Sequence, residues 1–326
     1  MLRTLILCFG LALSPLGHAA YSSLYVFGDS LLDSGNFYAM SGVNYPPSPP
    51  YAERFSNGPT AAEYLADRLG IALAPSVEGG TNFAVGGATT GTLNYGYEIG
   101  LPDNLPPAIE FTGMQAQLDW FFATPPAFDP AASLFVIWGG ANDLSLALAQ
   151  GGDLLQAADT AIGNLIGIVG ALTGAGATNL LVPDLPNLAH TPFAAALSDA
   201  QRDGLELLTA GFNFALESGL QQIRDLAPAG LNLMGFDTNA FFDQVIASPA
   251  LFGFEDATST CLSALAAGTA TRCDGFVFFD DMHPTTAMHQ LVGDLFFARV
   301  PEPSTAALLA VALISALGVR RATQAH

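Results

Sequence analysis

The feature that most constrains the fold is an alternation of short apolar runs with longer helical patterns. Apolar runs of strand length, each followed by a turn, lie at 22–28, 133–140, 179–184 and 231–237, with a shorter fifth candidate at 81–87. Helical patterns lie at 60–70, 114–123, 153–174, 198–226 and 284–300, several opening on a capping Thr, Ser or Asp. Strands alternating with helices predict an α/β fold in which helices cover both faces of a mostly parallel sheet of about five strands.

Residues that follow the apolar runs are predicted to share one crevice. Ligands of open parallel sheets bind beyond the carboxyl ends of the strands. Ser30, the pair Gly86 and Gly87, and Asn142 each come just after a run. The span from about 21 to 300 contains no long linker, charge block or repeat of fixed period, so we expect a single domain there.

Composition excludes several classes of protein. The chain has no lysine, nine arginines and 29 acidic residues, for a formal net charge of −20. Without lysine there is no P-loop, Schiff-base enzyme or Ser-Lys hydrolase. The strongly negative charge argues against a nucleic-acid partner.

The stretch FGDSLLDSGN at 27–36 places Ser30 directly after the first run. One interpretation is a helix N-cap, and the other is a nucleophile that projects from the rim of the sheet where a strand gives way to a helix. Serine is a poor nucleophile at neutral pH and needs a base within about 3 Å that is oriented by a third group. A candidate base must therefore come from elsewhere in the chain.

The stretch FFDDMHPT at 278–285 offers that base. Asp280 and His283 are three residues apart, so on one turn their side chains share a face and the carboxylate can orient the imidazole. Asp281 is predicted to point elsewhere. His190 and His289 lack an aspartate at useful spacing and are interpreted as packed or solvated histidines.

Acyl transfer also needs donors for an oxyanion. The stretches NFAVGGATTG and WGGANDL supply glycine amides and the side chain of Asn142. A glycine lets the backbone N–H approach a substrate closely, and an asparagine provides an NH₂ donor. Taken separately, Gly-rich turns and an asparagine after a strand are common structural features.

In order along the chain, GDSLLDSGN, NFAVGGA, GGANDL and DDMHPT resemble the four blocks of the GDSL lipase/esterase family of SGNH hydrolases, over about 23 to 297. The resemblance implies a three-layer α/β/α, flavodoxin-like sandwich and ester hydrolysis without a metal or cofactor. It assigns the nucleophile to Ser30, the acid to Asp280 and the base to His283. It assigns the oxyanion donors to the Ser30 amide, the Gly87 amide and the Asn142 side chain. Gly86 remains a competing choice for the glycine donor.

The resulting hypothesis is an exported serine esterase or lipase that cleaves carboxylic esters through an acyl-enzyme. Two alternatives stay open. The fold could serve a non-catalytic surface or matrix-binding protein, because fold does not determine function, or the same site could transfer an acyl group to an alcohol. The ester or lipid substrate is not specified by the sequence.

Residues 1–20 are expected to be a secretory signal peptide. Arg3 precedes an apolar run at 5–13, and the small residues Gly17, Ala19 and Ala20 follow. A permanent anchor is the weaker interpretation, because the run is shorter than the roughly 20 residues of a spanning helix.

Residues 301–326 resemble the PEP-CTERM sorting signal of Gram-negative bacteria. Pro301-Glu302-Pro303 precedes an apolar stretch and then Arg320-Arg321. The resemblance implies processing by an exosortase-type enzyme and transient membrane association, with the arginines cytoplasmic and the mature chain outside the inner membrane. A plain tail anchor is the alternative.

Cysteine usage is consistent with export. Cys8 would leave with the signal peptide, so Cys261 and Cys273 remain. We expect these two to form a disulfide in an oxidising compartment. Free thiols at a metal site are the alternative, but nearby ligands are too few.

Overall fold

The centre of the fold is a parallel sheet of four strands. The computed structural model describes residues 21–123, 127–227 and 229–301. Strands β1 (Ser23–Gly28), β2 (Ser133–Trp138), β3 (Asn179–Pro183) and β4 (Asn232–Phe236) pair in that order. Every pairing is parallel, with Val26 beside Val136 and Val136 beside Leu181. Each crossover between neighbouring strands contains helices, as parallel pairing requires.

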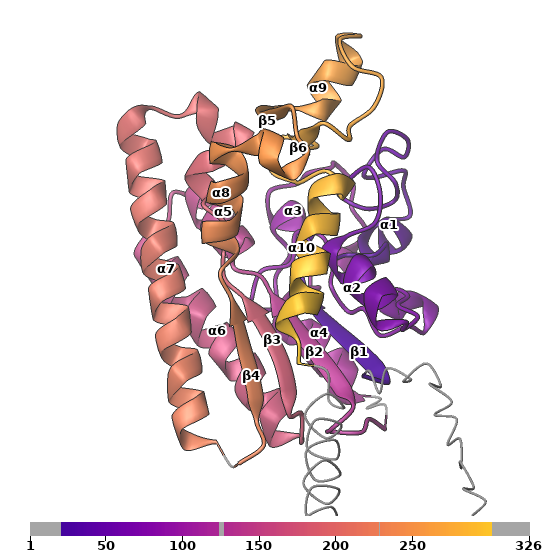
Figure 1. The fold of residues 1–326 in the computed structure, drawn as a ribbon, viewed down its shortest axis with the longest axis vertical. Coiled ribbons are helices and arrows are strands. Elements are labelled where there is room, and N and C mark those ends of the chain that lie inside the picture. Colours follow the sequence, from indigo (N-terminus) through magenta and orange to yellow (C-terminus); the bar gives the residue numbers. More distant parts are fainter. Residues whose placement is uncertain (1–20, 124–126, 228, 302–326) are drawn as a thin grey trace, which may run out of the picture. The chain divides into compact units, whose positions relative to one another are not determined.

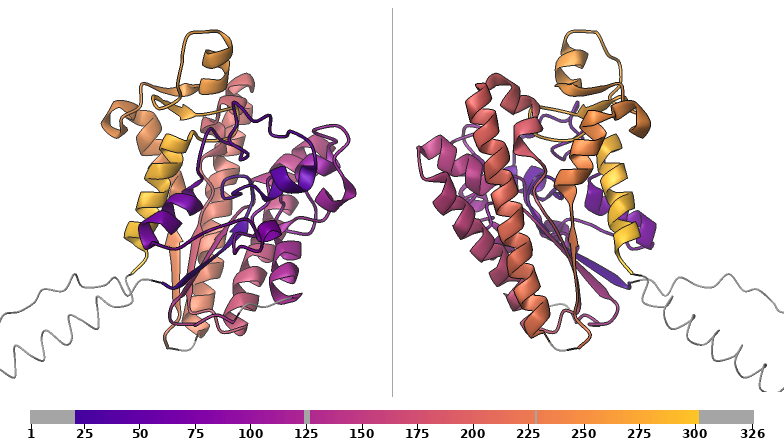
Figure 2. Two further views of the ribbon diagram at one scale, coloured as in Figure 1. Left: turned by 90° about the vertical axis from the view of Figure 1, so that its right-hand side faces the viewer. Right: turned by 60° about the vertical axis from the view of Figure 1, so that its left-hand side comes forward.

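Helices cover both faces of this sheet and make three layers (Figures 1 and 2). Alternate side chains of a strand point to opposite faces. On one face, residues such as Val26 and Leu181 pack against α2 (Ala61–Leu69), α8 (Thr238–Ala247) and α10 (Thr286–Arg299). On the other face, residues such as Phe27 and Leu180 pack against α4 (Met114–Ala123), α6 (Leu154–Gly174) and α7 (Asp199–Leu226). The predicted α/β/α sandwich is confirmed.

The predicted fifth strand at 81–87 is wrong. This segment runs parallel to β1 along its outer edge, where Phe83 N–H donates to Val26 O at 2.8 Å and Val85 N–H donates to Gly28 O at 3.1 Å. It makes only isolated bridges, from Asn82 to Val26 and to Pro75. The chain then turns at Gly87, whose φ is +76°, so the ladder does not continue.

Shorter elements surround these layers. The remaining helices are α1 (Asn36–Ser41), α3 (Tyr95–Glu98), α5 (Ala141–Gln150) and α9 (Cys261–Ala266), with 3₁₀ turns η1 (Ser76–Glu78), η2 (Pro107–Ile109), η3 (Leu188–His190), η4 (Pro192–Ala196) and η5 (Pro249–Phe252). Strands β5 (Asp256–Thr260) and β6 (Phe276–Phe278) form a second, two-stranded parallel sheet. The structure joins Cys261 and Cys273 in a disulfide, with a Cα–Cα distance of 5.4 Å.

Among the helices that the structure describes, α6 has the length and composition of a membrane span, with 21 residues and a mean hydropathy of 1.3. Its residues Ala161, Leu165 and Val169 are buried against the sheet layer. A helix that covers the sheet of an α/β sandwich can be as long and as apolar as a membrane span, and α6 is such a covering helix. The expected signal peptide and sorting signal lie outside the described residues, apart from Pro301.

Candidate active site

Ser30 lies in a turn at the carboxyl end of β1. Gly28 ends the strand, and a Cβ there would lie 2.4 Å from the carbonyl oxygen of Trp138, so the close approach of β1 and β2 requires glycine. After it, Leu32 and Asp33 N–H donate to Asp29 O at 3.1 and 3.0 Å. The expectation that Ser30 begins a helix is wrong. Helix α1 starts only at Asn36, because the N–H groups of Leu31 and Gly35 bond to aspartate side chains, so the turn at Asp29 does not continue as a helical ladder.

Three side chains that the sequence singled out form a hydrogen-bonded chain. His283 Nε2 lies 2.8 Å from Ser30 Oγ, across 253 positions of sequence. His283 Nδ1 lies 2.9 Å from both Oδ1 and Oδ2 of Asp280. The order hydroxyl, imidazole, carboxylate is the arrangement that activates a serine nucleophile.

The turn that carries Asp280 and His283 is a bend and not part of a helix. Asp280 Oδ1 accepts the N–H groups of Met282 and His283 at 2.9 and 2.7 Å. Phe279 N–H donates to His283 O at 2.8 Å and closes the bend. Asp280 and His283, three residues apart, are therefore brought together by a turn in which the Asp280 side chain accepts backbone N–H groups. Asp281 does not bond to the imidazole; its carbonyl accepts the N–H of Phe193.

Electrostatics favour an ionised carboxylate beside a basic imidazole. Burial raises the pKa of Asp280, but the charge and N–H of His283, with further donors, lower that pKa to about 2. Burial lowers the pKa of His283, but the charge and hydrogen bond of Asp280 and the charge of Asp29 raise it above that of an ordinary histidine. A more basic imidazole is a better acceptor for the hydroxyl proton of Ser30.

Candidate oxyanion donors surround Ser30. The N–H of Gly86 donates to Asp33 Oδ2 at 2.8 Å and is therefore already in use. Within the described residues, the N–H of Gly87 has no hydrogen-bond partner. Asn142, in the first turn of α5, uses one of its two side-chain hydrogens on Ala88 O at 3.0 Å. Gly87 and Asn142 thus both hold a free N–H at the site, whereas Gly86 does not.

These groups open into a largely apolar cavity of about 450 Å³. Ser30, Gly86, Gly87, Asn142, Asp280 and His283 all line it. Its apolar and aromatic lining includes Phe37, Tyr45, Phe55, Tyr95, Ile99, Leu188, Phe193, Phe242, Ile246 and Met282. The volume and lining suit an apolar group of modest size.

The other described histidines, His190 and His289, lie outside the cavity and have different surroundings from His283. His190 Nδ1 lies 2.8 Å from Asp243 Oδ1, an aspartate that comes from α8 and not from nearby sequence. This aspartate lies 53 positions away, beyond the reach of a spacing argument, and neither residue lines the cavity. His289 is buried, and burial lowers its pKa to about 3, as for a packed histidine. The described residues contain no cluster of His, Cys, Asp or Glu that could hold a metal.

Comparison with known proteins identifies the family. The profile of the family described as GDSL-like lipase/acylhydrolase matches residues 24–296. The chain belongs to this family. The four sequence blocks and the α/β/α fold agree with that membership.

The chain is also similar to individual curated proteins and to a solved structure. Lipase 1 of Photorhabdus luminescens is 26% identical, over 92% of this chain and 53% of its own length, so the chain spans about half of that relative. A phosphatidylcholine-sterol acyltransferase of Aeromonas hydrophila is 26% identical, over 84% of this chain and 89% of its own length. A structure from Parabacteroides merdae described as a GDSL-like lipase has a TM-score of 0.48 at 14% identity, covering 86% of this chain and 95% of that one.

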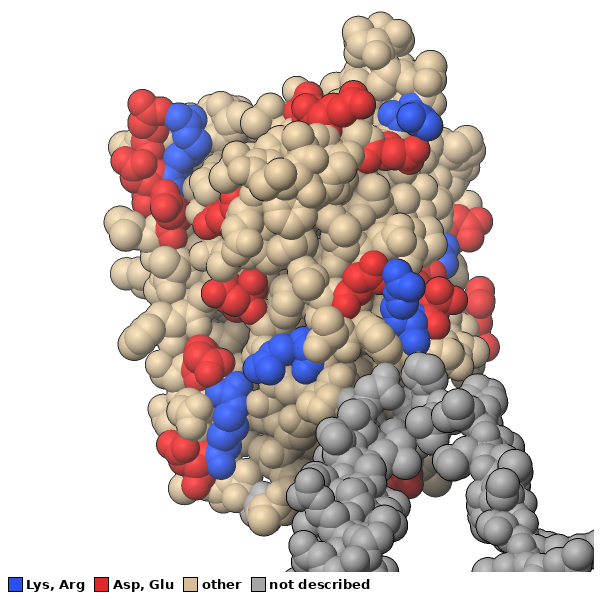
Figure 3. Space-filling view, in the orientation of Figure 1, with Lys and Arg blue, Asp and Glu red and all other residues tan. Residues whose placement is uncertain are grey.

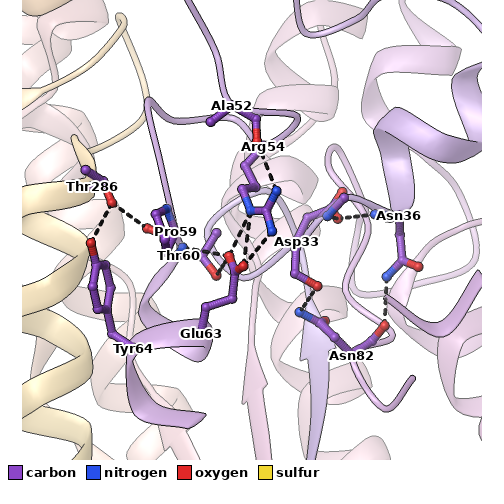
Figure 4. Close-up of polar contacts among 12 residues, drawn as sticks. Asp33, Asn36, Ala52, Arg54, Pro59, Thr60, Glu63, Tyr64, Asn82 and Thr286 are labelled. Atoms are coloured by element: carbon purple, nitrogen blue, oxygen red, sulfur yellow. Dashed lines mark hydrogen bonds and ion pairs between the residues drawn. The ribbon is translucent and has the colours of Figure 1, made fainter. Parts of the chain in front are cut away.

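Sequence reasoning missed the buried network behind the GDSL serine. Asp33 accepts the N–H groups of Gly35 and Asn36 at 2.8 and 2.7 Å, besides that of Gly86. Asn36 Nδ2 donates to Asn82 O at 2.7 Å, which Figure 4 shows. This network joins the turn of Ser30 to the segment that carries Gly87. The available signal was a run of polar residues, DSGN at 33–36, next to the serine.

Phe55 is a second residue that the sequence did not reveal. Its ring centroid lies 5.2 Å from that of His283. A Cβ on Gly86 would lie 2.0 Å from Phe55 Cε2, so Gly86 has to be glycine to admit the ring. The role of Gly86 is therefore to accommodate the side chain that packs against the imidazole.

Proposed function

We propose that this GDSL-family protein is a serine esterase that cleaves carboxylic esters through an acyl-enzyme. The observation that carries the proposal is the chain from Ser30 Oγ to His283 Nε2 at 2.8 Å and from His283 Nδ1 to Asp280 at 2.9 Å. Each distance is that of a hydrogen bond already formed for proton transfer.

The reaction proceeds in two halves. Ser30 Oγ bonds to the carbonyl carbon while its proton passes to His283 Nε2, and the carbonyl oxygen becomes an oxyanion. As the oxyanion collapses, the bond to the alcohol oxygen breaks and that oxygen takes the proton from His283. Water then repeats the sequence on the acyl-serine, releasing the acid and restoring Ser30. Asp280 stabilises the imidazolium in both halves.

The oxyanion is proposed to bind the N–H groups of Ser30 and Gly87 and the side-chain NH₂ of Asn142. The free N–H of Gly87 supports its choice over Gly86. The apolar cavity supports a lipid-like or other apolar acyl ester as substrate. Because a relative that shares most of its length with this chain is named as an acyltransferase, transfer of the acyl group to an alcohol is the second candidate function.

The decisive experiment compares two serine variants. Ser30→Ala should reduce hydrolysis of a short p-nitrophenyl ester by on the order of 10⁴-fold or more. Ser218→Ala removes a half-buried hydroxyl on α7, which does not line the cavity, and should leave the rate unchanged. An organophosphate should label the parent protein at Ser30 and leave Ser30→Ala unlabelled.

Other outcomes separate the alternatives. An unlabelled, inactive parent protein would support the non-catalytic binding protein. Equal activity of Ser30→Ala and the parent would refute the assignment of the nucleophile. A new ester formed when an alcohol is added would favour acyl transfer over hydrolysis, and a chain-length series of esters would report how deep the acyl site is.

We also propose that the protein is exported. The signal-peptide pattern at 1–20 and the PEP-CTERM pattern at 301–326 support this, together with the disulfide between Cys261 and Cys273, because disulfides persist in oxidising compartments. The proposal includes an exosortase-type processing partner and transient membrane association of the C-terminal segment. The intact mass of the exported protein tests it: loss of about 20 N-terminal residues and of the C-terminal segment is expected, and full-length cytoplasmic protein would contradict it.

A further inference from the structure

Tyr51 contacts the carboxylate of the proposed triad from a distant part of the chain. It lies in the loop between α1 and α2, 229 positions before Asp280. Its hydroxyl donates to Asp280 Oδ2 at 2.7 Å. Its ring packs edge-on against Phe279, with the centroids 4.8 Å apart. The hydroxyl and the ring therefore hold two consecutive residues of the bend that carries His283.

The two oxygens of Asp280 are held differently. Oδ1 accepts two backbone N–H groups of its own bend, besides His283 Nδ1. Oδ2 accepts only His283 Nδ1 and the Tyr51 hydroxyl among the described residues. Tyr51 is thus the one group from outside the bend that determines where Oδ2 lies, and with it the plane of the carboxylate.

We propose that Tyr51 is a positioning residue that holds the Asp280 carboxylate in the plane where it can orient His283 toward Ser30. The inference rests on the proposed function, because orienting the imidazole matters only if Ser30 is the nucleophile. Tyr51 acts through Asp280, so it is not itself a catalytic residue.

The loop of Tyr51 is anchored firmly enough for this role. Arg54 pairs with Glu63 of α2 at 2.6 Å and donates to Ala52 O at 3.0 Å, as Figure 4 shows. Ser56 Oγ donates to Pro284 O at 2.8 Å, which joins the loop to the residue after His283. A donor held by such contacts loses little conformational entropy when it binds the carboxylate.

The hydroxyl remains a donor over the working range of pH. Burial, together with the charge of Asp280, raises the pKa of Tyr51 above that of an ordinary tyrosine. The charged group that faces Tyr51 in this contact is therefore a carboxylate, with the phenol protonated. A neutral donor to a carboxylate is among the stronger hydrogen bonds in proteins.

The test is Tyr51→Phe, which keeps the ring on Phe279 and removes only the hydroxyl. We expect kcat to fall about tenfold, the loss of one hydrogen bond to a charged group. KM should stay within about twofold, and the loss should be the same for short and long acyl chains. Tyr64→Phe is the matched control: its hydroxyl bonds to Thr286 Oγ1 at 2.9 Å, outside the cavity (Figure 4), so kcat should not change.

A pH profile adds a measurement that a purely structural role would not move. Asp280 and Asp29 raise the pKa of His283, and neutral His289 lies near it. Without the Tyr51 hydroxyl the Asp280 anion is more basic and stabilises the imidazolium more. The acid limb of kcat/KM should therefore move to higher pH in Tyr51→Phe and stay in place in Tyr64→Phe.

Proton NMR separates failure of this inference from failure of the proposed function. The His283 Nδ1 proton in its bond to Asp280 gives a downfield resonance that needs no turnover, and Tyr51→Phe should shift it. An unchanged resonance and a parental kcat would overturn the role of Tyr51 even in an active esterase. A loss confined to KM of long-chain esters would overturn it too, by showing that Tyr51 contacts substrate.

Discussion

At the scale of single residues, the site depends on which N–H groups are already bonded. Gly86 and Gly87 are adjacent and both glycine, yet only the first amide is bonded to Asp33, which leaves Gly87 as the proposed oxyanion donor. Gly87 has φ +76°, and a Cβ there would lie 2.7 Å from Asn94 Oδ1, so its backbone also excludes larger residues. The side-chain amide of Asn142, the other proposed donor, comes from a different element, α5.

Asn142 gives a prediction at this scale. Asn142→Ala should lower kcat by about 10²- to 10³-fold with little change in KM, because one oxyanion donor is removed. Asn142→Asp keeps the volume but replaces the donor with an acceptor, so its loss should be at least as large. Steady-state kinetics on one p-nitrophenyl ester checks both. Rates close to the parent in both variants would remove Asn142 from the oxyanion site.

At the scale of elements, the segment formed by β5, α9 and β6 packs against the bend that carries Asp280 and His283. Figure 1 shows these three elements gathered beyond one end of α10. Strand β6 ends at Phe278, two residues before Asp280. Leu262, next to Cys261, donates its N–H to Phe279 O at 2.9 Å, and Cys261, Cys273 and Phe279 form one buried cluster. The disulfide therefore lies one hydrogen bond away from the bend of Asp280.

The predicted effect of the disulfide follows from this placement. The variant Cys261→Ser/Cys273→Ser should lower the free energy of unfolding by about 2–4 kcal/mol, since the bridge constrains the unfolded chain. Because the same cluster holds Phe279, kcat should fall at a temperature where the variant is still folded. Denaturant unfolding and kinetics at 15 °C measure the two effects. Parental stability with parental kcat would show that the segment of β5, α9 and β6 does not support the site.

At the scale of the whole molecule, several carboxyl groups are buried, in addition to the charged side chains at the surface. The face in Figure 3 is mostly uncharged, with acidic side chains scattered among small patches of arginine. Burial raises the pKa of Asp29, Asp33 and Asp143 to about 6 and that of Asp184 to about 7. Around neutral pH these buried carboxyl groups ionise, which costs free energy in the native state because the charges are removed from water. The same groups ionise without that cost in the unfolded chain.

Stability and activity should therefore respond to pH in opposite directions. Between about pH 4 and 7 the native state holds more protons on these carboxyls than the unfolded chain, so the free energy of unfolding rises as pH falls. His283, whose pKa is raised, acts in the same direction above the pKa of an unfolded histidine, while His289, whose pKa is lowered, opposes it. Activity should fall over the same range, because His283 must be neutral to act as base.

Thermal unfolding checks the stability half of this prediction. We expect Tm to increase by about 5 °C between pH 8 and pH 5.5. Asp33→Asn should flatten the rise by removing one of the titrating groups. A Tm that decreases steadily from pH 8 to pH 5.5 would contradict the prediction, whatever the activity does.

The sequence by itself determined the order of strands and helices and the residue types that the candidate site holds. The periodicity of the apolar runs predicted four strands and five helices within a few residues of their observed bounds, because periodicity reflects burial on one or both faces. The spacing of Asp280 and His283 predicted their contact, because residues three apart share a turn. The prediction of a strand at 81–87 is wrong, because an apolar run by itself does not determine how many backbone hydrogen bonds the segment makes with a neighbouring strand.

Only the tertiary structure decided how distant residues meet. The 2.8 Å contact between His283 and Ser30 and the 2.7 Å contact between Tyr51 and Asp280 join positions more than 200 residues apart. The choice of Gly87 over Gly86 depended on where the side chain of Asp33 points. Local sequence sets backbone preferences over a few residues, whereas these contacts depend on the path of the whole chain, which packing of the two helical layers on the sheet determines.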